Sequence, residues 1–194
     1  MIDPDAFIDG LWEGSKNSGY NESANDVEKS QFETFDNNNY DWYNDIIIDG
    51  SHLVDGKLKP NVKYKSGEYD YIYSTDVSGR ICQVYVEELQ YTARDYRERH
   101  NPNTFGKLKG DHAGHLIADR FGGSKELDNL VSQSALVNLS KYKRIENQWA
   151  RAIKKGQKVT TNIEVRYNGN SMRPSGFMIE YNIDGRYYSE SITN

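Results

Sequence analysis

Three side chains that can act together on a phosphodiester are spaced at short intervals in the second half of the chain. His115 follows a glycine, Asn138 lies 23 residues further on, and Glu146 follows 8 residues after that. A histidine can take a proton from water, an amide oxygen can bind a hard cation, and a nearby carboxylate can support the site. The spacing therefore indicates metal-assisted cleavage of a phosphodiester.

The elements around these residues predict that they share one cleft. Short strands are expected over residues 115–117 and 129–131, separated by a glycine turn, and a helix is expected over 140–155. The helix is indicated by apolar residues at steps of three and four, which form one face: Tyr142, Ile145, Trp149 and Ile153. Two strands followed by a helix bring a strand histidine and an asparagine at the helix entry into one cleft.

Helix geometry separates the roles of the amide and the carboxylate. If the chain from Asn138 to Glu146 were fully helical, the rise between them would be about 12 Å. Their side chains could close most of that gap without reaching a shared metal contact. Glu146 is therefore expected to hold metal-bound water or to orient the site.

The remaining pattern predicts strands. Residues 69–73 and 80–87 alternate around a turn at 76–79, which indicates a hairpin, and residues 98–110 have the composition of a loop. Three alternating segments joined by Asn-Gly and Asp-Gly turns predict an antiparallel C-terminal meander: residues 160–167, 177–183 and 187–192. The fold class expected is α+β.

Composition narrows the class of protein. The 194 residues are only 36% hydrophobic but include 15 tyrosines, which supply large bodies with polar tips. The one cysteine, Cys82, excludes an internal disulfide, argues against a cysteine-based zinc site, and is expected to be a small strand residue. No apolar run reaches the length of a membrane span, and no signal-peptide pattern opens the chain.

Charge is distributed unevenly along the chain. Residues 1–60 contain 13 acidic and 4 basic groups, a net charge of −9, whereas residues 61–194 carry +4. Residues 1–57 are predicted to form an acidic, weakly structured segment ahead of a domain over 58–194. That segment could cover the substrate groove or receive a partner, or it could simply solubilise the chain. The helix also carries a basic stripe, either solvated or facing phosphates: Lys141, Arg144 and Arg151, with Gln148 and Lys155.

The residues around this pattern resemble the DNA/RNA non-specific endonucleases of the ββα-metal (His-Me finger) class. The resemblance covers roughly residues 58–194 and extends to nuclease toxin domains of secreted bacterial effectors, including those of type VII secretion. Four segments carry it: Gly114-His115, Asp128-Asn129-Leu130-Val131-Ser132-Gln133, Val137-Asn138-Leu139-Ser140 and Arg144-Ile145-Glu146. It implies a ββα-metal core within the α+β fold.

The resemblance also implies roles for particular residues. His115 would be the general base that activates water, and Asn138 would be the protein ligand of a single Mg²⁺, with Mn²⁺ as the alternative ion. Glu146 would support the hydrated ion, because Mg²⁺ gives up its waters reluctantly.

The chain departs from the Asp-Arg-Gly-His signature of that class. His112 stands three residues before His115, the acid Asp111 lies one place earlier, and the arginine of the signature is missing. Either the segment contains an insertion or Asp111 is structural, and His112 is a second candidate for the base. Arg120 is the expected replacement for the missing arginine, with Arg144 and Arg151 behind it.

The function expected from these features is a Mg²⁺-dependent endonuclease that cleaves DNA without sequence preference, with RNA as an alternative substrate. Such an enzyme would act as a secreted antibacterial toxin domain in the cytoplasm of a target cell. A cognate immunity protein and a secretion chaperone would be its protein partners, with no membrane partner. The alternative is a non-catalytic acidic module that mimics nucleic acid and inhibits a nuclease, which the sequence pI of 5.4 favours. Sequence-specific HNH cleavage would need readout elements that the sequence does not indicate.

Overall fold

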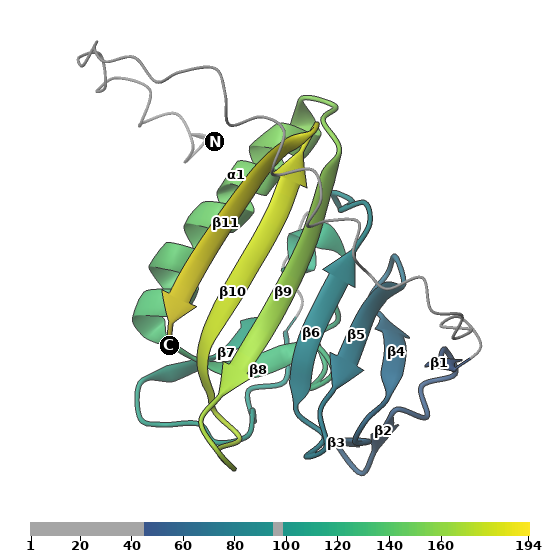
Figure 1. The fold of residues 1–194 in the computed structure, drawn as a ribbon, viewed down its shortest axis with the longest axis vertical. Helices are drawn as coiled ribbons and strands as arrows, with labels where there is room; N and C mark the ends of the chain where they lie inside the picture. Colours follow the sequence, from purple (N-terminus) through teal and green to yellow (C-terminus); the bar gives the residue numbers. More distant parts are fainter. Residues whose placement is uncertain (1–44, 95–98) are drawn as a thin grey trace, which may run out of the picture. The chain divides into compact units, whose positions relative to one another are not determined.

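A seven-stranded sheet forms the body of the protein in a computed structural model that describes residues 45–94 and 99–194 (Figure 1). Its strands are antiparallel to their neighbours except at one edge, where β1 runs parallel to β4. In spatial order they are β1 (Ile46–Ile47), β4 (Lys63–Ser66), β5 (Tyr71–Thr75), β6 (Ile81–Val86), β9 (Val159–Tyr167), β10 (Pro174–Ile183) and β11 (Arg186–Thr193). With its helix, the fold is α+β, as predicted.

The predicted hairpin and meander are both confirmed. β5 and β6 pair antiparallel across the turn at 76–79, and β9, β10 and β11 form the C-terminal meander. Cys82 lies in β6, half-buried, and its thiol donates to the Ser74 carbonyl of β5 at 3.4 Å. Side-chain alternation predicted these strands because each one buries one face and exposes the other.

The described structure begins before the predicted domain boundary. β1 and β2 (Leu53–Val54) lie within residues 1–57. β3 (Lys57–Leu58), which pairs with β2 in a short ribbon, spans the predicted boundary. His52 in that segment is buried, and its Nε2 lies 3.2 Å from a carboxylate oxygen of Asp128. The division at position 57 stays a prediction, and residues 1–44 lie outside the described part.

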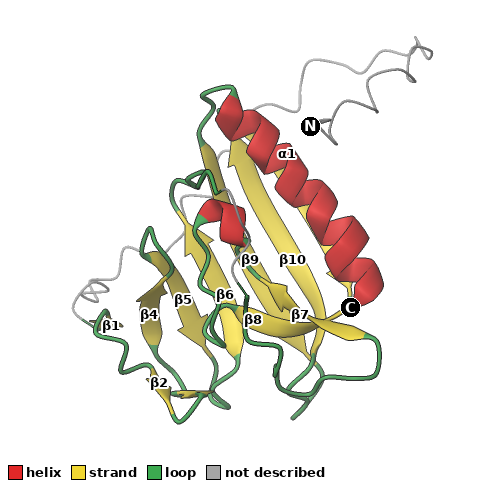
Figure 2. Cartoon of the chain, turned by 180° about the vertical axis from the view of Figure 1, so that it is seen from behind, coloured by secondary structure: helices red, strands yellow, loops and turns green. Residues whose placement is uncertain are grey.

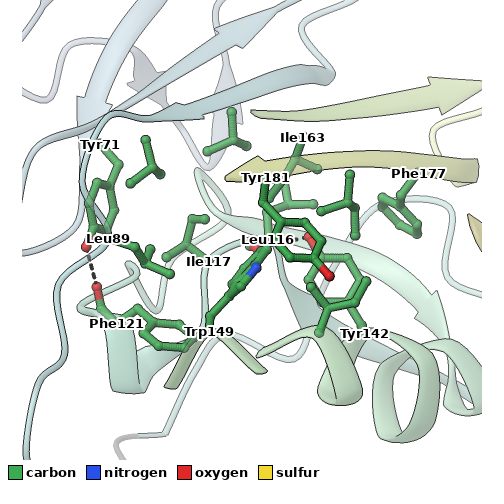
Figure 3. Packing of buried hydrophobic residues seen from close by; sticks show 14 of the residues in the cluster. Tyr71, Leu89, Leu116, Ile117, Phe121, Tyr142, Trp149, Ile163, Phe177 and Tyr181 are labelled. Carbon is green, nitrogen blue, oxygen red and sulfur yellow. Dashed lines mark hydrogen bonds between the residues drawn. The ribbon is translucent and has the colours of Figure 1, made fainter. Parts of the chain in front are cut away.

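One face of the sheet is covered by the helix α1 (Tyr142–Lys154) and by the ribbon of β7 (Asp111–His115) and β8 (Leu130–Ser134) (Figure 2). The core lies between these layers. The predicted apolar face of the helix points into it: Tyr142, Ile145 and Trp149 are buried, and Ile153 is half-buried. Figure 3 shows Trp149 near both Phe121 and Tyr181, with ring centroids 6.1 and 5.6 Å apart.

Three elements around the site differ from the sequence prediction. The strand that carries the histidine is Asp111–His115 rather than 115–117, and its partner strand is Leu130–Ser134 rather than 129–131. The helical segment starts earlier than 140, with a π-helical turn η3 (Val137–Lys141) that leads into α1. Leu116 and Ile117 are fully buried, but Ile117 hydrogen-bonds to the side chain of Asn129 instead of a strand partner. No helix within the described residues has the length and apolar character needed to cross a membrane.

Candidate active site

The ribbon of β7 and β8 places His115 at its end. The register pairs His115 with Leu130 and Gly114 with Val131, so β7 stops where the chain turns toward the core. The His115 residue is only 7% exposed, and its ring meets His100 edge to face, with centroids 4.9 Å apart. His115 is thus held by packing, as a group that must meet a substrate in a fixed orientation should be.

Glycines flank the segment that holds His115 because no side chain fits there. A Cβ on Gly114 would lie 2.3 Å from the side chain of Gln133, which is fully buried in β8. A Cβ on Gly123 would lie 1.8 Å from the carbonyl oxygen of Ile117. The Gly-His and Gly-Gly pairs of the sequence therefore follow from close packing between the ribbon and the loop that joins its strands.

Buried tyrosine hydroxyls fix the backbone of that loop. Tyr71 of β5 donates to the Phe121 carbonyl at 2.8 Å, and Tyr142 of α1 donates to the Leu116 carbonyl at 3.0 Å (Figure 3). Burial raises the pKa of Tyr71 to about 12, so its hydroxyl stays protonated and remains a donor at ordinary pH. Two more such bonds run from Tyr64 to the Asp128 carbonyl and from Tyr73 to the Asn129 side chain. The tyrosine-rich composition thus contributes directly to the placement of the site.

The π turn orients the helix side of the site. In an uninterrupted α-helix, eight residues would leave Asn138 and Glu146 roughly 80° apart around the axis. The Tyr142 amide instead donates to the Val137 carbonyl, five residues back, so η3 has more residues per turn and each advances by a smaller angle. This wider turn brings Asn138 toward the face that carries Glu146, and both side chains line the same pocket.

One pocket of about 440 Å³ gathers four of the predicted site residues. His115, Arg120, Asn138 and Glu146 all line it, although they come from β7, the short 3-10 helix η2 (Asp119–Phe121), η3 and α1. The other lining residues are Tyr91, Thr92, Arg94, Ala118, Asp119, Leu139 and Lys143. The arrangement joins a histidine, an amide, a carboxylate and three cationic side chains around one space.

Arg120 is held at the pocket by the helix. Its Nη2 donates to Asn147 Oδ1 at 2.9 Å and lies 3.5 Å from Glu146 Oε2. The guanidinium also stacks over the ring of Phe121, with 5.2 Å from its carbon to the ring centroid. These contacts fix the group that was expected to replace the missing arginine of the signature.

Sequence reasoning missed two cationic side chains of the pocket. Lys143 lies one helical turn before Glu146, and that three-residue spacing could have identified it. Arg94 comes from the segment after β6; its Nε lies 3.2 Å from Asp119 Oδ1, and it also pairs with Glu68. No spacing in the sequence links Arg94 to the site, because only the fold brings residue 94 beside residue 115.

The predicted nucleic-acid-binding stripe lies elsewhere on the helix. Lys141, Arg144 and Arg151 are exposed, and none of them lines the pocket. Arg144 is roughly 160° around the axis from Glu146 and pairs with Glu190 of β11 at 3.0 Å. Their role in nucleic-acid binding stays a prediction, and it would require a substrate that extends beyond the pocket.

Asp111 and His112, the two residues at which the chain departs from the Asp-Arg-Gly-His signature, have different contacts. Asp111 forms a two-pronged ion pair with Arg173, at 2.7 Å to Nε and 3.0 Å to Nη2, and its side chain is 4% exposed. His112 instead reaches the site, because its Nδ1 lies 3.1 Å from Asn138 Nδ2. These contacts give Asp111 a structural environment and leave His112 beside the predicted metal ligand.

Asp111→Asn should lower the free energy of unfolding at neutral pH by about 2–3 kcal/mol, because it breaks a largely buried ion pair and leaves Arg173 without its partner. The Arg173 guanidinium holds the pKa of Asp111 below its ordinary value. Such a carboxylate stabilises the fold above its unfolded-state pKa, and that contribution is lost as the pH falls through the folded-state pKa. Denaturant unfolding of both proteins at pH 7 and pH 3 should therefore show a difference that shrinks in acid. Equal stability at pH 7 would contradict the structural role.

An antiparallel ribbon that ends in a histidine, followed by a helix that carries an asparagine and a glutamate, defines the core of a ββα-metal nuclease. The chain belongs to the DNA/RNA non-specific endonuclease family, whose family model matches residues 60–185, more than half of the chain. The family expected from the sequence is thereby confirmed.

Individual relatives extend this comparison. The type VII secretion system protein EssD of Staphylococcus aureus, in strains USA300 and NCTC 8325, is 40% identical over 147 residues, which cover 71% of this chain and 24% of the relative. The chain thus spans about a quarter of the length of the curated relatives it matches. The solved structure of the Sda1 nuclease with bound zinc ion has a TM-score of 0.52 at 18% identity, covering 63% of this chain and 75% of that one. At that identity the likeness shows the fold.

Proposed function

We propose that this chain is a metal-dependent endonuclease that hydrolyses DNA without sequence preference, with RNA as the second candidate substrate. The observation that carries the proposal is the pocket that His115, Arg120, Asn138 and Glu146 line together. His115, Asn138 and Glu146 were selected by residue type and spacing, and Arg120 as the replacement for the arginine of the signature. The four come from separate elements, and convergence on one space is what a catalytic constellation requires.

The donor set of the pocket fits a hard divalent cation. The Asn138 amide nitrogen faces His112, which leaves the amide oxygen as the donor for an ion, and the Glu146 carboxylate lies on the same pocket. Within residues 45–94 and 99–194, no group of three His, Cys, Asp or Glu side chains is placed to hold a metal. A site with only a few oxygen donors is suitable for Mg²⁺, because that ion keeps most of its waters as ligands. Mn²⁺ accepts the same kind of donor. When bound, the ion would supply charge neutralisation at the scissile phosphate.

The residues of the chain would perform the remaining chemistry. The neutral imidazole of His115 takes a proton from a water molecule, whose oxygen forms a bond to phosphorus. The bond from phosphorus to the 3′ oxygen breaks, the 3′ oxygen takes a proton from solvent, and the product carries a 5′-phosphate. Arg120 and Arg94 donate to the non-bridging oxygens, where negative charge develops in the transition state.

The pocket also supports the absence of sequence preference. Its cationic side chains, Arg94, Arg120 and Lys143, match phosphate oxygens, which every nucleotide presents alike. Sequence readout needs side chains that reach base edges in a groove, and a helix or ribbon inserted there. α1 instead packs one face on the core and turns another toward the pocket.

The relatives support a secretion context for this activity. Because EssD is a type VII secretion system protein, we propose that this chain is the nuclease part of a secreted antibacterial toxin that acts in the cytoplasm of a target cell. A nuclease active in its producer would degrade the producer's own DNA. A cognate immunity protein that covers the pocket is therefore expected, with a secretion chaperone as a second partner.

Cleavage of supercoiled plasmid by the purified full chain tests the proposal. With Mg²⁺ or Mn²⁺ we expect nicked, then linear, then fragmented DNA. With EDTA we expect no cleavage, because the pocket provides the base but not all of the positive charge needed to neutralise the scissile phosphate in the transition state. A single-stranded RNA incubated in parallel tests the second substrate. Intact plasmid in both metals, together with inhibition of an unrelated nuclease by the chain, would instead support the acidic nucleic-acid mimic.

A further inference from the structure

His112 has a contact that the catalytic scheme does not use. It is the second residue of β7, half-buried, and its Nδ1 lies 3.1 Å from Asn138 Nδ2 across the boundary between the ribbon and η3. The amide nitrogen of asparagine carries only hydrogens to donate, so Nδ1 of His112 is the acceptor. The two side chains are thus joined by a hydrogen bond of defined direction.

This direction decides which atom of the Asn138 amide is free to bind an ion. An asparagine amide can occupy nearly the same space in two orientations, related by exchange of its oxygen and nitrogen. An acceptor at His112 stabilises the orientation in which nitrogen faces the ribbon and oxygen faces away from it. Within residues 45–94 and 99–194, His112 is the side chain that hydrogen-bonds this amide. In the opposite orientation the amide would present N–H groups to a cation, which repel it.

The register of the ribbon sets the position of His112 on β7. The register of β7 and β8 sets His112 opposite Gln133, which is fully buried and fills the space that Gly114 leaves open. His112 itself does not line the pocket, whereas Asn138 does. The histidine therefore lies behind the amide rather than beside a substrate.

We propose that His112 is a positioning residue that holds the Asn138 amide with its oxygen toward the pocket and thereby sets the affinity of the site for a divalent cation. The inference rests on the proposed function, because it takes Asn138 as the ligand. Residues that orient a metal ligand in this way typically account for about 10–100-fold in metal affinity. The expected scale is therefore large enough to measure directly.

Calorimetric titration of the full chain with Mn²⁺, without nucleic acid, tests the proposal independently of cleavage. His112→Leu removes the acceptor at similar size and should weaken Mn²⁺ binding about 10-fold or more. His112→Asn is the matched variant, because its Oδ1 can take the place of Nδ1 as acceptor, and it should bind Mn²⁺ within about threefold of the parent. In an Asn138→Ala background, His112→Leu should have no further effect, because the amide it orients is gone. Thermal unfolding of each protein shows that it is folded, and His112→Phe, which keeps a ring without an acceptor, replaces the leucine variant if that one is not.

The outcomes separate this inference from the proposed function. If Asn138→Ala binds Mn²⁺ as the parent does, the amide is not a metal ligand and the metal site itself is misassigned. If Asn138→Ala loses binding while folded His112→Leu retains it, the site stands and the positioning role of His112 is overturned. Equal weakening in His112→Leu and His112→Asn would assign the effect to packing of the ring, and that also overturns the proposal.

Discussion

Replacement of His115 by alanine should lower plasmid cleavage at least about a hundredfold while the protein stays folded. Loss of a positioned general base costs a nuclease on this scale, because attacking water must then lose its proton to bulk solvent. The residue ends β7 and borders the pocket, so alanine removes the proposed base together with its ring contact to His100, and thermal unfolding checks that the variant is folded. Initial rates on supercoiled plasmid at saturating Mg²⁺ measure the effect.

Two comparisons isolate the role of a base from other roles of a histidine. Added imidazole can enter the space left by the ring, so it should restore part of the activity of His115→Ala, with rates that rise with the concentration of neutral imidazole. High Mg²⁺ should restore cleavage by His112→Ala but not by His115→Ala, since only His112 acts through metal affinity. If His115→Ala cleaves like the parent while His112→Ala is inactive at every Mg²⁺ concentration, the base has been assigned to the wrong histidine.

The hairpin of β5 and β6, the C-terminal meander and the helix could be predicted from local sequence, whereas the short strands β1 to β4 and the assembly of the sheet could not. Alternation over residues 159–167 and 174–183 reflects one buried face per strand, and the step of three and four in α1 reflects its contact with the core. The pairing of β6 with β9 joins segments that are more than 70 residues apart. No local pattern encodes such a pair, because it forms only when both strands cover the same core.

The displaced strand shows how tertiary contacts override a local pattern. Leu116 and Ile117 are apolar, which predicts a strand, and both side chains are fully buried, as they would be in a strand of the core. One further backbone bond follows His115, from the Leu116 N–H to the Asn129 carbonyl. The side chain of Asn129 then takes both the N–H and the carbonyl of Ile117, so backbone pairing stops before Ile117. A side-chain amide that replaces a strand partner cannot be distinguished from a polar strand residue in the sequence.

Residue type and spacing selected three residues that line one pocket, but they missed two of its cationic side chains, Arg94 and Lys143. His115, Asn138 and Glu146 belong to one short stretch, whose ribbon and helix are neighbours in the chain. Arg94 enters from a distant segment, and the stripe of Lys141 and Arg144 lies on another side of the helix. The net charge of −5 does not describe the pocket either, because residues 1–60 carry −9 and residues 61–194 carry +4.

Asn138→Ala should lower cleavage and Mg²⁺ dependence together. The amide is the neutral oxygen donor that the pocket offers to a hard cation, and alanine leaves that position without any ligand atom. We expect the rate at low Mg²⁺ to fall by about a hundredfold, because a lost direct ligand should cost at least as much as a lost supporting partner. Higher Mg²⁺ should recover only part of the loss. Rates over a Mg²⁺ series, fitted for the half-saturating concentration and the limiting rate, separate affinity from turnover.

Two control variants, Asn138→Asp and a surface substitution, test whether the loss of activity in Asn138→Ala comes from the missing oxygen ligand. Aspartate keeps a hard oxygen at nearly the same place, so it should retain metal binding, although it alters charge beside Glu146 and can no longer donate to His112. Asn170→Ala removes an exposed amide from the turn between β9 and β10 and should cleave like the parent. The metal mechanism requires that every active variant stop in EDTA. Full activity of Asn138→Ala in EDTA would mean that the pocket cleaves without a metal, and that His115 and the arginines carry the reaction alone.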